Sequence, residues 1–424
     1  MRPYLLMAAL YLALAALAAL SSALEGLGLL QFFNGLRWLR VHLITLGGLT
    51  QLAFGLLPAM TARRTGIVPP RTRWDIWVAL NLGLLILLTG IPLMNSILII
   101  TGGMLVFAAT SLLVHELWRI WRAQPVRSPS LTRHKPDTRP FYLAAVVYLL
   151  VGILAGTGLW FGWGTALGMD APIEVHVHAN LWGFTALLLA GLVTQIYPEL
   201  TGTSAAWPKR LPVIFWGMTL GALGLVSGPW LGSNALTLTG LIIHSLASLA
   251  LLASWSWPLL RKQARRSPGL LHILLAYIWF ILPVVVAPLI VFRMGETARE
   301  ISGSGGPILI YGWILPVLYA LLPYFVRRWM HPGKDVRSGG TWFSLLAVQA
   351  GSLLFWTSLF LPTASAALRP AAYSFWLVSL VAVLYDLFRS LRLVQGQETT
   401  GLEPVAPAVH PDTDRHVLEE DINR

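Results

Sequence analysis

The sequence predicts an all-α polytopic integral membrane protein with about twelve transmembrane helices in three four-helix quasi-repeats. Three observations favour this class. Hydrophobic residues make up 56% of the 424 residues and charged residues 11%, with a mean hydropathy of +0.68, which is more apolar surface than a water-soluble core can bury. Apolar runs long enough to cross a hydrocarbon layer of ~30 Å recur along the chain. Particular residues recur at constant offsets.

The apolar runs define twelve predicted spans, each long enough to cross the bilayer at about 1.5 Å per residue. They cover residues 4–24, 41–61, 75–93, 96–118, 141–163, 177–198, 212–229, 235–257, 270–292, 306–326, 342–361 and 371–388. The first run also resembles a secretory signal, with small residues at 21–23 where cleavage would occur. We interpret it as a span because the repeat requires one at this position.

The formal net charge of +12 comes from basic residues in the short connections between spans, such as Arg63, Arg64 and Arg261. Membrane insertion explains this pattern, so the charge does not indicate nucleic-acid binding. Lys and Arg gather after the even-numbered spans, which predicts a multi-pass protein of a prokaryotic inner membrane with both termini in the cytoplasm. Tryptophans at the span ends suit anchors at the lipid headgroups: Trp160, Trp163, Trp207, Trp255, Trp257 and Trp342.

The absence of cysteine excludes disulfides, iron–sulfur clusters and thioether-attached haem. Any redox centre must therefore use other ligands.

The repeat is visible in individual residues. His42, Gly47 and Gly55 recur as His178, Gly183 and Gly191 at an offset of 136, and Thr101-Gly102 recurs as Thr239-Gly240 at 138. The third copy is visible at its end, where residues 115–119 are echoed by residues 385–389. Close helix packing is sufficient to explain the glycines. The predicted units are about 1–135, 136–267 and 268–394 of one membrane domain, followed by a disordered cytoplasmic tail at 395–424.

Four of the ten histidines are candidate ligands. His42, His176 and His178 lie at the outer ends of the second and sixth spans, and His244 lies inside the eighth. An ionisable residue inside a membrane is a functional candidate by default. The alternative is a neutral imidazole that simply bonds a neighbour near the headgroups. The other histidines, including His272, are expected to be solvated or interfacial.

Two imidazoles across an apolar gap suit the axial positions of haem b. Zinc would need three or four ligands, with Glu174 joining the histidines, and copper would use imidazoles with Met169 nearby. Residues two apart on a helix point to nearly opposite sides, since each residue advances about 100°, so one span can serve two pockets. We expect His42 and His178 to be axial ligands, and His176 to face a second pocket that holds a second haem or copper with His244.

A family resemblance rests on the stretch from His176 to Gly202, which reads HVHANLWGFTALLLAGLVTQIYPELTG. It resembles the signature helix of the haem-copper oxidase subunit I superfamily and of its NnrS-type relatives, which are associated with haem, copper and nitric oxide. The resemblance implies twelve spans in three arcs and makes His42 similar to the low-spin haem ligand of the oxidases. The His176–His178 dyad is similar to the pair that the oxidases place on their tenth span, although the tenth span here contains no histidine.

The chain also departs from the oxidases at the copper site. It has no adjacent His-His pair on the seventh or eighth span and no His-x-x-x-Tyr on the sixth. Proton-pumping reduction of oxygen is therefore not expected.

The resulting hypothesis is a haem-binding membrane protein that acts in electron transfer or in handling nitric oxide or another diatomic gas. Its expected partners are membrane lipid, a redox partner or quinol, and additional membrane subunits, and an oxidoreductase activity is left open. Two alternatives remain: a cofactor-free solute transporter, favoured by prolines that would interrupt the ninth and tenth spans (Pro283, Pro288, Pro316 and Pro323), and a scaffold subunit that has lost its cofactors.

Overall fold

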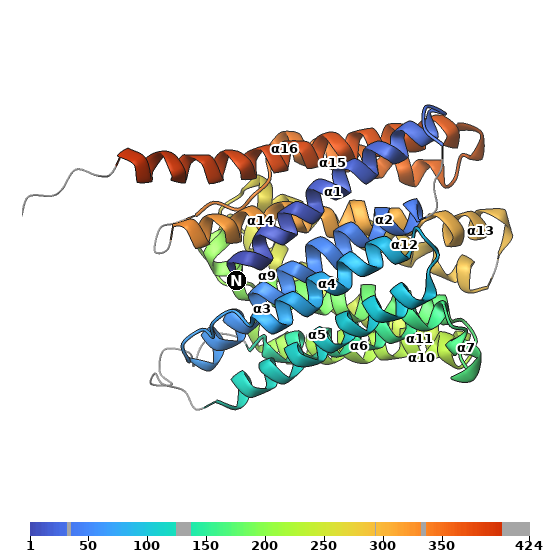
Figure 1. Cartoon of the computed structure of the whole chain (residues 1–424), viewed down its shortest axis with the longest axis horizontal. Coiled ribbons are helices and arrows are strands. Elements are labelled where there is room, and N and C mark those ends of the chain that lie inside the picture. The colour runs from blue at the N-terminus through green and yellow to red at the C-terminus, as the bar shows by residue number, and fades with distance from the viewer. Residues whose placement is uncertain (32–34, 124–136, 293, 332–335, 401–424) are drawn as a thin grey trace, which may run out of the picture.

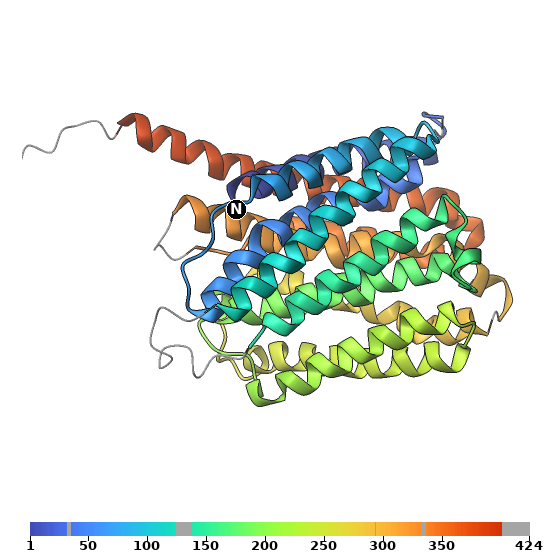
Figure 2. The ribbon, with the colours of Figure 1, turned by 60° about the horizontal axis from the view of Figure 1, so that its bottom comes forward.

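The computed structural model describes residues 1–31, 35–123, 137–292, 294–331 and 336–400, and this part of the chain contains helices and no strand. The long helices run roughly along one direction, as Figure 1 and Figure 2 show from two sides. The N-terminus lies toward one end, and the short helices α7 (Trp163–Ala166) and α13 (Gly295–Ser304) lie at the other. We call the first the basic end, because Met1 lies there beside Arg71 and Arg73. We call the second, where α7 and α13 lie, the outer end.

The remaining elements follow the predicted spans in chain order. They are α1 (Arg2–Gly26), α2 (Leu36–His42), η1 (Leu43–Leu49), α3 (Thr50–Thr65), α4 (Trp74–Gly90), α5 (Ser96–Arg122), α6 (Arg139–Leu159), α8 (Pro172–His178), η3 (Ala179–Thr185), α9 (Ala186–Thr201), η4 (Pro208–Arg210), α10 (Leu211–Trp230), α11 (Asn234–Leu260), α12 (Pro268–Val291), η5 (Ile308–Ile314), α14 (Leu315–Met330), α15 (Trp342–Ser358), η6 (Pro362–Ala364) and α16 (Ser365–Thr400).

The all-α membrane class is confirmed. Ten helices of the described residues are long and apolar enough to cross a membrane, and the shorter apolar helix α4 accompanies them. Helix α15, with 17 residues, is of similar length to α4. The number of twelve crossings, the unit boundaries and the cytoplasmic placement of the termini stay predictions.

Three of these long helices form the interior of the bundle. The buried share of an 18-residue apolar stretch in each long helix distinguishes these three. This share is 100% in Ile308–Met330, 83% in Pro172–Thr201 and 78% in Leu36–Thr65, and it is 50% or less in the other seven helices. Each of the three contains a seven-residue π-helical segment, η1, η3 or η5. These segments start 136 and then 129 residues apart. We call the three the inner helices.

The same close contact supports all three π segments. A Cβ atom added at Gly47 or Gly312 would lie 2.6 Å or 2.9 Å from ring atoms of Tyr11 or Trp279, and one at Gly183 would overlap the ring of Tyr148. Each aromatic residue comes from the helix that precedes the inner helix in the chain. Glycine is thus required where an outer helix presses an aromatic ring against an inner one.

The recurring Thr-Gly pairs also have a packing role. A Cβ on Gly102 would lie 2.8 Å from the carbonyl oxygen of Gly83, and one on Gly240 would lie 2.7 Å from that of Gly221. In both repeats the glycines let the two helices of a hairpin, α4 with α5 and α10 with α11, approach backbone to backbone. The packing explanation of these glycines is confirmed.

One expectation about the chain's course is corrected. Helix α12 is continuous through Pro283 and Pro288, and η5 and α14 adjoin without a break around Pro316 and Pro323, so these prolines do not interrupt their spans. Helix α16 extends to Thr400. Of the tail predicted from residue 395, residues 401–424 lie outside the described residues.

Candidate haem or metal site

Three of the four candidate histidines lie at the same end of two inner helices. His42 is the last residue of α2, immediately before η1, and His176 and His178 lie in the last turn of α8, immediately before η3. Both short helices are toward the outer end of the bundle, where α8 follows α7. The third inner helix has Pro307 before η5, so it supplies no imidazole there.

The structure brings His42 next to His176. Their ring centroids are 6.3 Å apart and their planes are inclined by 25°. Two imidazoles on opposite sides of one metal ion have centroids roughly 6 Å apart, since each metal–nitrogen bond is about 2 Å long. His42 also stacks on Trp38, with centroids 4.3 Å apart and planes at 10°. The separation of the two histidine rings is therefore compatible with axial coordination of one metal.

Backbone carbonyls hold both rings by the same nitrogen. His42 Nδ1 lies 2.9 Å from the carbonyl oxygen of Trp38, and His176 Nδ1 lies 2.8 Å from that of Gly152 on α6. A carbonyl oxygen only accepts, so each Nδ1 carries the proton and donates it. The Nε2 atom then holds the lone pair and is the metal-binding nitrogen, and bonding of the other nitrogen fixes the tautomer as in known metal sites.

His176 has further neighbours that fix its position. The Asn180 side-chain nitrogen donates to the carbonyl oxygen of His176 at 2.8 Å and lies 3.2 Å from its Nδ1. A Cβ added at Gly156 would lie 2.5 Å from both Cε1 and Nδ1 of the ring. The imidazole thus rests directly on the backbone of α6, at a position that only glycine permits.

His178 serves a different side of the same helix. Its Nδ1 lies 2.6 Å from the carbonyl oxygen of Leu225 on α10, and its ring meets Trp182 edge to face with centroids 5.1 Å apart. The prediction that one span serves two directions agrees with this arrangement. The predicted partner of His42, however, was His178, whereas the ring beside His42 is that of His176.

His244 differs from the other three. It is fully buried in α11 and uses both ring nitrogens, because Nε2 donates to the carbonyl oxygen of Trp182 at 3.1 Å and Nδ1 accepts from the Ser248 hydroxyl at 3.2 Å. Its ring packs 6.0 Å from that of Phe280. With no free lone pair in this arrangement, His244 has the contacts of a structural histidine.

The other predicted donors do not complete a larger metal site. Glu174 is exposed, and the Nδ1 atoms of His176 and His178 bind backbone carbonyls. Met169 packs in a small apolar cluster with Val175 and Ala179. Within the described ranges, no three or more His, Asp or Glu side chains gather as metal ligands, which leaves the three- or four-ligand zinc site without support.

Sequence reasoning placed His272 wrongly. It is fully buried near the start of α12, where Nε2 lies 3.0 Å from the Ser344 hydroxyl and Nδ1 has no hydrogen-bond partner within the described ranges. A Cβ at Gly340, whose φ is +80°, would lie 2.5 Å from the ring. The glycine pair Gly339-Gly340 was the only sequence sign that a ring packs closely against this loop.

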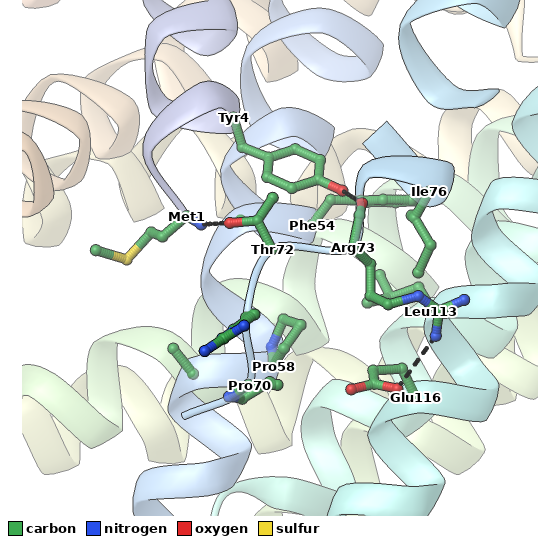
Figure 3. Close-up of a pocket in the computed structure, with 13 residues that line it drawn as sticks. Met1, Tyr4, Phe54, Pro58, Pro70, Thr72, Arg73, Ile76, Leu113 and Glu116 are labelled. Atoms are coloured by element: carbon green, nitrogen blue, oxygen red, sulfur yellow. Dashed lines mark hydrogen bonds and ion pairs between the residues drawn. The ribbon is translucent and has the colours of Figure 1, made fainter. Parts of the chain in front are cut away.

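Two cavities between described residues lie at the basic end. The smaller, about 50 Å³, lies between α1, α3 and α5 and is shown in Figure 3. There the Met1 amino group donates to the Thr72 hydroxyl, and Arg73 bridges the buried Glu116 and the exposed Asp75. The hydrogen bond to Asp75 raises the pKa of Arg73, which stays cationic. The larger, about 150 Å³, lies between α3, α9, α10 and α11.

Comparison with known proteins places the chain in a family. A family model described as NnrS protein matches residues 138–400, which is more than half of the chain. The match includes His176, His178 and His244 and leaves His42 outside. A comparison with curated proteins found no match.

Proposed function

Because the chain belongs to the NnrS family of haem- and copper-associated membrane proteins, we propose that it binds haem b through His42 and His176 and acts in electron transfer. The observation that carries the proposal is the pair of imidazoles 6.3 Å apart, each with Nδ1 bonded to a carbonyl and Nε2 without a hydrogen-bond partner among the described residues.

The residues of this chain would hold the haem in three ways. The imidazoles of His42 and His176 would supply the axial nitrogens, and a haem so held provides one-electron chemistry within an apolar protein. The Trp38 and Gly152 carbonyls keep each ring in one tautomer and raise the basicity of Nε2. The stacked indole of Trp38 restricts rotation of the His42 ring.

Electron transfer is the favoured role at this pair because both His42 and His176 would hold the haem, which would then supply one-electron chemistry and not a binding site for a gas. A redox partner or quinol would supply the electrons. The distribution of Lys and Arg supports the proposal of a prokaryotic inner membrane protein with both termini cytoplasmic.

A second role, handling of nitric oxide or another diatomic gas, is favoured by His178. It too has Nδ1 tied to a carbonyl, and its Nε2 has no hydrogen-bond partner among the described residues. A metal held by a single imidazole keeps a position open for a gas. This second metal would be haem or copper. His244 is left out because both of its nitrogens are engaged.

The test is an absorption spectrum of the protein purified from a host supplied with a haem precursor. We expect a Soret band that shifts on reduction with dithionite. His42→Ala and His176→Ala should each lower the haem content at least about tenfold. That is the loss seen when a residue that only hydrogen-bonds a metal ligand is removed, and a ligand itself should matter more. His115→Ala, an exposed histidine of α5, is the matched control and should keep the full spectrum.

Two outcomes would reject the proposal. A colourless wild-type preparation would support the cofactor-free transporter. A normal spectrum in both His42→Ala and His176→Ala would remove the pair as ligands, and His178→Ala would then be the variant that tests the remaining imidazole.

A further inference from the structure

The larger cavity at the basic end contains an arginine that has no counter-ion in the described part of the chain. Arg64 lies in the last turn of α3 and lines the cavity, and its buried Nε has no hydrogen-bond partner among these residues. Among the described residues no carboxylate lies within ion-pair distance of its guanidinium, since the nearby Asp137 carboxylate binds Arg139. A cation partly removed from water is costly unless an anion accompanies it.

The side chain of Gln195, which also lines this cavity, already has its hydrogen bonds. Gln195 Oε1 accepts hydrogen bonds from the hydroxyls of Tyr142 at 2.6 Å and Thr138 at 2.8 Å, and its Nε2 donates to the Met60 carbonyl at 3.1 Å. Gln195 therefore does not balance the charge of Arg64. The wall also contains Ser204 and two engaged hydroxyls, since Thr194 accepts from the Trp255 indole and Ser254 donates to the Ala206 carbonyl. Its apolar part consists of the buried side chains of Leu211, Ile214 and Leu251.

The mouth of the cavity has the composition of a membrane interface. Trp207, which is 40% exposed, packs 5.7 Å from Trp257, and the guanidinium carbons of Arg210 and Arg261 lie 5.6 Å and 4.9 Å from the respective ring centroids. Trp207 adopts φ +51°, a left-handed conformation that is rare for a bulky residue and common at ligand sites. Tryptophan with arginine marks the headgroup level.

The size of the cavity limits the ligand. A volume of about 150 Å³ is below the roughly 300 Å³ of ordinary small-molecule sites. It suits a headgroup, with acyl chains remaining outside. Next to the mouth, α10 presents a stripe of exposed apolar side chains at helical spacing, Val213, Trp216 and Leu220, against which such chains can lie.

We propose that this cavity binds the phosphodiester headgroup of an anionic phospholipid, with Arg64 as the counter-ion. Basic pockets between transmembrane helices on the cytoplasmic side bind such headgroups. The site is separate from the histidine pair, and it does not depend on a haem.

The test is the lipid retained by the full-length protein, measured by native mass spectrometry after extraction from vesicles of phosphatidylcholine mixed with phosphatidylglycerol. Wild-type protein should retain phosphatidylglycerol in preference to phosphatidylcholine. Arg64→Gln should lose that retention. The control Arg71→Gln removes an exposed charge outside this cavity and should retain the lipid.

A second variant separates lipid binding from folding. Ile214→Phe fills the cavity and keeps Arg64, so it should lose the lipid while the protein remains monodisperse. Equal retention of the two lipids by wild type, or retention of phosphatidylglycerol by Arg64→Gln, would overturn the proposal. Displacement of the lipid by millimolar inorganic phosphate would reassign the cavity to a soluble anion and would overturn it as well.

Discussion

At the scale of single residues, the partners of each ring nitrogen distinguish one buried histidine from another. His42, His176 and His178 each bind a carbonyl through Nδ1, which leaves Nε2 for a metal. His244 has partners on both nitrogens, and the position in the sequence does not reveal this difference. Hydrogen-bond partners thus separate candidate ligands from structural histidines where burial alone does not.

Gly156 gives a residue-scale prediction. Gly156→Ala would place a Cβ 2.5 Å from the His176 ring. We expect the imidazole of His176 to move away from its present position beside the imidazole of His42. We expect haem affinity to fall about tenfold, as for other residues that orient metal ligands, measured by haem titration of apoprotein. Gly303→Ala, where an added Cβ meets nothing within 4 Å, should leave the affinity unchanged. Unchanged affinity in Gly156→Ala would argue against His176 as a ligand.

At the scale of elements, the π-helical segments set the histidine positions. Each π segment widens the backbone of an inner helix directly after one position. This position is His42 in the first inner helix, His178 in the second and Pro307 in the third. π-helical turns are uncommon and are frequent at functional sites. Here each one coincides with a glycine under an aromatic ring of the preceding outer helix.

The element-scale prediction concerns Gly183 in η3. An alanine there would overlap the ring of Tyr148, and this ring cannot withdraw freely because its hydroxyl donates to the Thr219 carbonyl at 2.8 Å. Overpacking should lower the free energy of unfolding by about 1–3 kcal/mol, seen as a lower Tm in detergent. Gly306→Ala, with open space around it, is the control. A Gly183→Ala protein as stable as this control would show that α6 can yield.

At the scale of the whole molecule, the three inner helices are joined at the basic end by one acid between two bases. Glu199 lies 2.8 Å from Arg63 and 3.9 Å from Arg328, and it accepts a hydrogen bond from the Tyr324 hydroxyl at 2.5 Å. Arg63, Glu199 and Arg328 are 136 and 129 residues apart, the same offsets as the π segments. Equivalent positions of the three inner helices thus meet at this end, which supports the quasi-repeat.

A double-mutant cycle tests this junction. Arg63→Gln and Glu199→Gln should each lower stability by about 1 kcal/mol, a modest value because the side chains are 44% and 30% exposed. The double variant should lose less than the sum, because removing one partner leaves the other without its contact. The control Arg299→Gln breaks a far more exposed pair with Glu296 and should have no effect. Strictly additive losses would mean that the junction does not couple the helices.

The sequence by itself determined the membrane class, most helix positions, the recurrence of His42 with His178 and the candidate histidines, because hydropathy, charge and residue spacing are local properties. It also indicated the NnrS relationship through the stretch that begins at His176. The third inner helix was predicted as a span, but its residue correspondence with the other two was not found, since it keeps Gly312 and Arg328 and replaces the histidine by Pro307.

Only the tertiary structure decided which imidazole lies beside His42. A side chain's direction at the end of a helix depends on the twist added by the π segment and on which neighbouring carbonyl captures Nδ1, and both depend on how α6 and α10 pack against the inner helix. The burial of His272 and the unpaired charge of Arg64 were decided in the same way. Contacts between segments that are distant in the chain leave no local pattern for a sequence to display.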